Sequence, residues 1–188
     1  MEQNPNNPKT KLLHGLRNPS DEGQAFMKTL ILYYSQARGN TRRIAEMLQK
    51  STGADIAEIE TVTPYTGSYE DIVNQGQEEV NEGFMPEIKP LLVKPKDYDR
   101  IILGTPTWWY TMAPAVKTFF SKNDLSGKTV ILFQTHGGWP GHVFKDMKSM
   151  IQGKVTGEFA VQFDSTGGDQ LVTPISEIEA WIGSVAND

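Results

Sequence analysis

From residue 27 onward, short apolar runs alternate with segments whose apolar residues recur at helical spacing. Consecutive Val, Ile and Leu residues are typical of strands buried on both faces of a parallel sheet, whereas apolar residues three and four positions apart are typical of amphipathic helices. The pattern predicts strands over residues 29–34, 54–61, 99–106, 128–135 and 158–163. It predicts helices over residues 40–52, 68–83, 113–122, 142–152 and 173–185.

This strict alternation predicts an α/β domain with a doubly wound, five-stranded parallel sheet and helices on both faces. Ligands of such sheets bind at the carboxyl ends of the strands, at the point where the strand order reverses. The loops after the first, third and fourth strands are therefore the expected binding site.

Residues 1–26 differ from the rest of the chain, because they are rich in Asn, Pro and charged residues and show no sustained period. They are either an N-terminal extension, surface-bound or flexible, or sequence upstream of a true start at Met27. We expect no catalytic role for them and assign residues 27–188 to one domain.

Composition narrows the function further. The chain has 188 residues, no cysteine and a formal net charge of −5. Without cysteine it has no disulfide, catalytic thiolate or Cys-ligated cluster, so redox chemistry would need a cofactor from outside. The acidic balance argues against nucleic acid as a partner. The chain shows neither a long apolar run nor a signal peptide, so we expect no membrane association and a cytoplasmic location.

The first loop runs from a strand into a helix with the sequence Ser35-Gln36-Ala37-Arg38-Gly39-Asn40-Thr41. Hydroxyls, loop amides and the helix dipole can together bind a phosphate dianion. Alternatively, Asn40 or Thr41 only caps the helix. Arg42 and Arg43 favour the phosphate: two cations in a first helical turn cost about 0.3–1 kcal/mol each, and a bound anion would remove that conflict. The loop matches neither a dinucleotide fingerprint nor a P-loop.

The second loop follows the third strand and reads Thr105-Pro106-Thr107-Trp108-Trp109-Tyr110. Three adjacent aromatic side chains are hard to explain by core packing, because successive side chains point in different directions. A planar conjugated ligand would stack on one or two of them. The alternatives are a dimer interface or a loop folded over Pro114.

The third loop follows the fourth strand and contains His136-Gly137-Gly138-Trp139. Two glycines let the backbone approach a flat ligand closely. His136 is either a donor near that ligand or a capping residue, and we expect His142 to face solvent. No carboxylate cluster accompanies the histidines, so we expect no metal site. A catalytic serine elbow is absent from the sequence.

Together, the motifs S-x-x-x-G-N-T, T-P-T-W-W-Y and T-H-G-G resemble the flavodoxin-like family, in particular its small flavodoxin and NAD(P)H-oxidoreductase-like FMN-binding branch. The resemblance covers residues 27–184. It implies strand order 2-1-3-4-5 with FMN at the switch point. It also implies that the first loop holds the FMN phosphate, that Trp108 or Trp109 lies against the isoalloxazine, and that the loop with the two glycines faces the pyrimidine end.

The chain departs from the family pattern at two positions. The first loop is one residue longer than usual, with Arg38 the extra residue, which either touches the phosphate or points outward. Tyr110 stands where relatives often have glycine after the Trp pair. Glycine permits a positive-φ peptide flip that tyrosine is expected to resist, and two-electron transfer would not need such a flip.

Three functions are compatible with these features. As an enzyme, the protein would take hydride from NAD(P)H and reduce a quinone-like acceptor in a cavity over the flavin, lined by Trp109, Tyr110, His136 and Trp139. As a carrier, it would move single electrons between partner proteins. As a flavin-free interaction module, it would bind a protein through the loop with the three aromatic residues and through the acidic helix predicted over residues 68–83. We favour the oxidoreductase; the catalytic residues and a homodimer stay open.

Overall fold

Five parallel strands form the sheet of the computed structural model, which describes residues 27–36 and 38–187. In sheet order they are β2 (Asp55–Glu58), β1 (Thr29–Tyr33), β3 (Arg100–Trp108), β5 (Thr129–His136) and β6 (Lys154–Gln162). The predicted order 2-1-3-4-5 is confirmed. A further short strand, β4 (Thr111–Met112), was not predicted and pairs antiparallel with the end of β3. The predicted extension over residues 1–26 lies outside the described residues, and so does Ala37.

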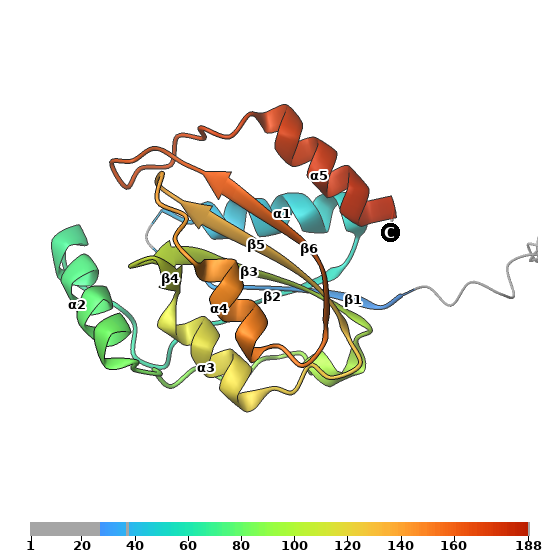
Figure 1. The fold of residues 1–188 in the computed structure, drawn as a ribbon, viewed down its shortest axis with the longest axis horizontal. Coiled ribbons are helices and arrows are strands. Elements are labelled where there is room, and N and C mark those ends of the chain that lie inside the picture. The colour runs from blue at the N-terminus through green and yellow to red at the C-terminus, as the bar shows by residue number, and fades with distance from the viewer. Residues whose placement is uncertain (1–26, 37, 188) are drawn as a thin grey trace, which may run out of the picture.

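Four helices cover the two faces of the sheet (Figure 1). On one face, α1 (Asn40–Thr52) and α5 (Ile175–Asn187) pack their apolar sides on β1, β3 and β5. On the other face, α3 (Pro114–Lys122) and α4 (Val143–Met150) bury a larger cluster. A short 3₁₀ helix, Pro95–Asp97, precedes β3. The sheet is thus buried on both sides, as its apolar strands require.

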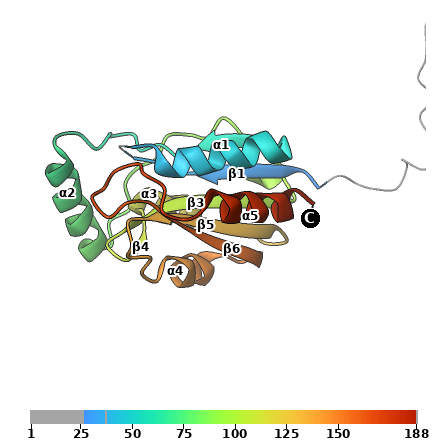
Figure 2. The ribbon, with the colours of Figure 1, turned by 90° about the horizontal axis from the view of Figure 1, so that it is seen from above.

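The helix α2 (Tyr69–Glu82) does not cover either face (Figures 1 and 2). In both views it stands beyond the carboxyl ends of the strands. It begins with a capping box: the Ser68 hydroxyl accepts the Asp71 amide at 3.2 Å, and the Asp71 carboxylate accepts the Ser68 amide at 2.8 Å. It ends at Gly83, whose φ of 66° suits glycine. This helix therefore borders the end of the sheet at which a ligand is expected.

The element boundaries differ from prediction mainly at the sheet's edges. The helix predicted over 40–52 is observed over the same residues, whereas β6 begins at Lys154 rather than at residue 158. Within residues 27–36 and 38–187, no helix combines the length and the apolar character needed to cross a membrane.

Gly104 lies at the centre of the sheet because its neighbour on β5 needs the space. Gly104 and Phe133 are paired across β3 and β5, and Phe133 is fully buried. A methyl group at position 104 would overlap the Phe133 ring. The aromatic ring thus fills the space that a glycine leaves on a pleated sheet.

We expect Gly104→Ala to destabilise the protein by about 1–3 kcal/mol, because it overpacks this position. Urea unfolding measures the loss. Gly157→Ala is the matched control: it also lies in a strand, but its added methyl would meet Ile131 at an ordinary 3.7 Å. Equal effects of the two substitutions would contradict this account of Gly104.

Candidate cofactor site

All three predicted loops border one cavity of about 700 Å³ at the carboxyl ends of the strands. The predicted residues that line it are Gln36, Arg38, Asn40, Thr41, Pro106, Thr107, Trp108, Trp109, Tyr110, His136, Gly137 and Trp139. The other predicted residues in the described part of the chain are not among those that line it: Ser35, Gly39, Thr105 and Gly138. The structure thus brings together loops that lie up to a hundred residues apart in sequence.

The start of α1, which has no side-chain cap at its N-cap position, lies at one end of this cavity. Gly39 is the N-cap residue, with φ 73°, and no side chain of the N-cap position accepts a helix amide. The Asn40 side chain instead donates to the Gly168 carbonyl at 2.9 Å, and Thr41 exchanges a hydrogen bond with Thr135 at 2.8 Å. The first turn carries no acidic residue. This helix start suits an anion, and the alternative that Asn40 or Thr41 caps the helix is wrong.

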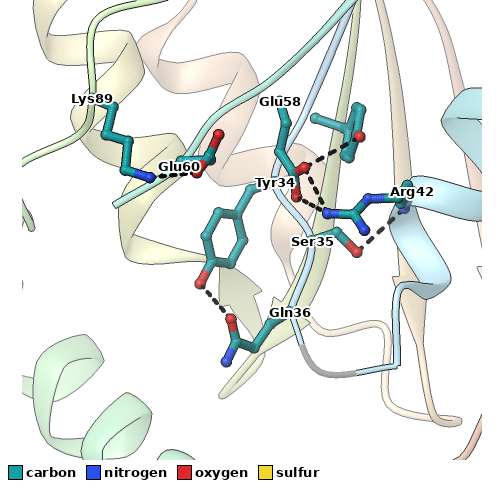
Figure 3. Close-up of polar contacts among 8 residues, drawn as sticks. Tyr34, Ser35, Gln36, Arg42, Glu58, Glu60 and Lys89 are labelled. Atoms are coloured by element: carbon teal, nitrogen blue, oxygen red, sulfur yellow. Dashed lines mark hydrogen bonds and ion pairs between the residues drawn. The ribbon is translucent and has the colours of Figure 1, made fainter. Parts of the chain in front are cut away.

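Neither Arg42 nor Arg43, in the first turn of that helix, is among the residues that line the cavity. Arg42 forms an ion pair with Glu58 of β2 at 2.7 Å, and its backbone amide donates to the Ser35 hydroxyl at 3.3 Å (Figure 3). Arg43 donates to the Asp169 carbonyl at 3.4 Å. A surface ion pair contributes about 0–1 kcal/mol, enough to offset an unfavourable helix dipole. The Glu58 carboxylate thus offsets part of the charge conflict that favoured a bound phosphate, and the phosphate stays a prediction. Of the arginines in this segment, Arg38 lines the cavity.

Trp109 and Tyr110 form the tight turn that joins β3 to β4, with φ of 47° and 67°. Two consecutive positive φ angles characterise a type I′ hairpin turn, which usually holds Asn or Gly. The expectation that Tyr110 resists a positive φ is therefore wrong. The His142 amide donates to the Tyr110 carbonyl at 2.7 Å, and the buried Thr105 hydroxyl accepts the Ala113 amide at 3.1 Å. These bonds hold the strained turn in place.

The tryptophans of the second loop are fixed by contacts of different kinds. The Trp108 ring meets Tyr34 and Tyr65 edge to face, with centroids 5.8 and 5.0 Å apart. The Trp109 indole N–H donates to the Val73 carbonyl of α2 at 3.1 Å. Both tryptophans line the cavity. They form a largely preformed aromatic wall, as ligand sites usually do.

His136 has one ring nitrogen engaged within its own loop. Its Nδ1 accepts the Gly138 amide at 3.0 Å, so the neutral ring carries its proton on Nε2. Burial lowers the pKa of His136 below its usual range, which favours the neutral form near pH 7. His136 does not cap a helix, since the N-cap residue of α4 is His142, and its role as a donor near a flat ligand stays a prediction.

Two segments that the sequence did not single out also line the cavity. One is the inner face of α2, and the other is the loop after β6. Hydrogen bonds from the Thr166 hydroxyl and then from loop amides lower the pKa of Asp164 to about 2, so its carboxylate orders this loop. The missed signals were an apolar stripe at helical spacing in an acidic helix, and a pair of glycines, Gly167 and Gly168, in the loop after the last strand.

Comparisons with known proteins agree on one family. A family model described as Flavodoxin matches residues 28–170. Flavodoxin 1 of Salmonella typhimurium is 31% identical over 106 residues, which are 54% of this chain and 46% of that protein. The chain therefore spans less than half the length of this curated relative.

Solved structures share the fold over more of the chain. A protein from Bacteroides eggerthii, provisionally assigned as a flavoprotein, has a TM-score of 0.66 and 27% identity over 85% of this chain and 98% of its own. A flavoprotein from Lactobacillus acidophilus, solved in complex with FMN, has a TM-score of 0.62 and 22% identity. It covers 71% of this chain and 93% of its own, and at this identity the likeness concerns the fold.

We expect Gly141→Ala to displace the Trp109–Tyr110 turn. Gly141 has a φ of 61°, and a methyl group there would overlap the Tyr110 carbonyl. The strained backbone alone costs about 1–3 kcal/mol, and the overlap adds to it. Urea unfolding of Gly127→Ala isolates the cost of the positive φ, because its methyl would meet no atom within 4 Å. Equal losses in the two variants would show that the turn needs no space at residue 141.

The free energy of unfolding should fall as the pH drops below about 6.5, in part because of His136. Its pKa is lowered in the folded protein, so the unfolded chain binds a proton there that the folded chain excludes. His136→Asn keeps an acceptor for the Gly138 amide but does not titrate. Urea unfolding from pH 7.5 to 5.5 should show that this variant loses less of its free energy of unfolding than the wild type. An unchanged dependence on pH would contradict the role given to His136.

Proposed function

Given that the chain belongs to the flavodoxin family, we propose that it is an FMN-dependent oxidoreductase that takes electrons from NAD(P)H and passes them to a quinone-like acceptor. The observation that carries this proposal is that a helix start without a side chain at its N-cap, an aromatic hairpin and a glycine loop meet in one cavity. The cytoplasmic location and homodimer formation stay predictions.

The residues present fit FMN. The start of α1, with Arg38, Asn40 and Thr41 beside it, would hold the phosphate. The aromatic hairpin and the loop at His136 would hold the ring. Among the described residues, the Thr107 hydroxyl is one of two buried side-chain atoms without a hydrogen-bond partner, and Thr107 lines the cavity. A flavin heteroatom would satisfy it. The FMN complex of the Lactobacillus acidophilus relative supports the same cofactor.

In the proposed reaction, NAD(P)H, a proton and a quinone give NAD(P)⁺ and a hydroquinone, so two electrons and two protons reach the acceptor. FMN, when bound, accepts the electrons from the nicotinamide and passes them on. The chain binds the cofactor, excludes water with Trp109 and Tyr110, and keeps a neutral imidazole donor at His136. The cavity extends beyond the three flavin loops to α2, which favours an enzyme over a carrier that exposes only the flavin edge.

The protein should bind FMN at least about 100-fold more tightly than riboflavin, because charge-assisted hydrogen bonds to a phosphate contribute about 1.5–3 kcal/mol each. Titration of the apo protein, followed by flavin fluorescence, measures both dissociation constants. Equal affinities for FMN and riboflavin would show that the start of α1 does not bind the phosphate. A colourless protein that leaves FMN fluorescence unchanged would favour the flavin-free interaction module.

With FMN bound, steady-state oxidation of NADH or NADPH with 1,4-naphthoquinone then separates the enzyme from the carrier. Turnover above that of free FMN is expected. An FMN-loaded protein without such turnover would instead be a carrier between protein partners.

A further inference from the structure

The inner face of α2 forms an apolar wall of the cavity. Tyr69, Ile72, Val73 and Gly76 line it, at the three- and four-residue spacing of one helical face. The opposite face is exposed and carries Glu70, Asp71, Glu78 and Glu82. An isolated acidic helix gains nothing from such a stripe unless the stripe contacts another apolar surface. Ile72 also packs against the core cluster that α3 and α4 cover, so the stripe both anchors the helix to the domain and borders the cavity.

Three contacts fix this wall in position. The Val73 carbonyl accepts the Trp109 indole N–H at 3.1 Å. Gly76 lies so close to Trp108 that a methyl group there would be 3.1 Å from the ring. At the other end, the Tyr69 hydroxyl would lie 2.7 Å from a methyl group at Gly167, so Tyr69 reaches the loop after β6. The helix is therefore a built part of the cavity, preformed as binding sites usually are.

The chemistry of this wall differs from that of the three loops. The loops offer amides, hydroxyls, Arg38 and an imidazole, which suit a phosphate and the polar edge of a flavin. The side chains of Ile72 and Val73 offer no donor and no charge. The cavity of about 700 Å³ lies in the upper part of the ~300–1,000 Å³ range of small-molecule sites. It has room for a second flat ring beside the flavin.

We propose that the first two turns of α2, through Ile72 and Val73, form the binding surface for the electron acceptor and select an uncharged planar ring such as a quinone. This inference rests on the function proposed above. The acceptor lies between the α2 wall and the flavin, takes two electrons from the reduced cofactor and two protons, and leaves as a hydroquinone. Ile72 and Val73 thereby set which rings fit.

Val73→Phe tests the proposal, because the larger side chain fills space in front of the wall and leaves the Val73 backbone carbonyl in place. The first readout needs no turnover: the dissociation constant of 1,4-naphthoquinone for the oxidised, FMN-loaded protein, followed by the flavin absorption without an electron donor. We expect this constant, and the KM for the same quinone, to rise about tenfold, as for a hydrophobic pocket that loses space. The rate with ferricyanide, an inorganic acceptor that needs no ring site, and the dissociation constant of FMN should stay within about twofold.

Val80→Phe is the matched control. Val80 lies on the same helix but lines a separate cavity of about 220 Å³, so the same substitution there should change neither quinone constant. Val73→Ala provides a second test if the larger side chain prevents folding. It enlarges the site and should improve the binding of 9,10-phenanthrenequinone relative to 1,4-naphthoquinone by about threefold or more.

Equal quinone constants for Val73→Phe and Val80→Phe, or an unchanged ring preference in Val73→Ala, would overturn the role of α2 while FMN binding and turnover persist. A loss of FMN affinity in Val73→Phe would also overturn it, because α2 would then contact the flavin itself. Failure of the proposed function is seen separately, in wild-type protein that binds no FMN or oxidises no NAD(P)H.

Discussion

The parallel pairing of β1 with β3 is the constraint on which the site depends. The two connections that leave these strands run to opposite faces of the sheet, so a crevice opens at their carboxyl ends. The three loops that sequence analysis predicted as the binding site all lie at this crevice, and they border the cavity. The fully buried pair of Gly104 and Phe133 keeps β3 and β5 packed directly behind it. The chemistry of the loops thus rests on a rigid sheet whose apolar strands leave no other arrangement.

Local sequence patterns predicted most of this fold, because they report burial directly. The sequence of α1 shows both its apolar face and, in Gly53, its C-terminal end, and the helix is observed over the predicted range. The β3–β4 hairpin was missed, since Trp109 and Tyr110 adopt a turn that their side chains disfavour locally. Tertiary bonds to His142 offset that preference. The partner of Arg42 was missed for a related reason, because Glu58 comes close only through the pairing of β1 with β2.

The position of α2 could not be deduced from its own pattern either. The apolar stripe of an amphipathic helix predicts that this face is covered, but it does not predict which part of the protein covers it. In this fold the other helices already cover the two faces of the sheet, and α2 stands beyond the carboxyl ends of the strands instead (Figure 2). There it lines the cavity. A helix at this place adds an apolar wall to a cavity that loops otherwise border.

The hydrogen bonds at the start of α1 connect parts of the chain that are synthesised far apart in time. Asn40 bonds to Gly168, 128 residues later, and Thr41 bonds to Thr135, 94 residues later. Contacts of such large sequence separation form late in folding, because long loops must close first. A chain still emerging from the ribosome therefore lacks the bond from Asn40 until the loop after β6 has been made. The start of α1 is thus held in its final surroundings only when nearly the whole domain is present, although its own residues are among the first to be made.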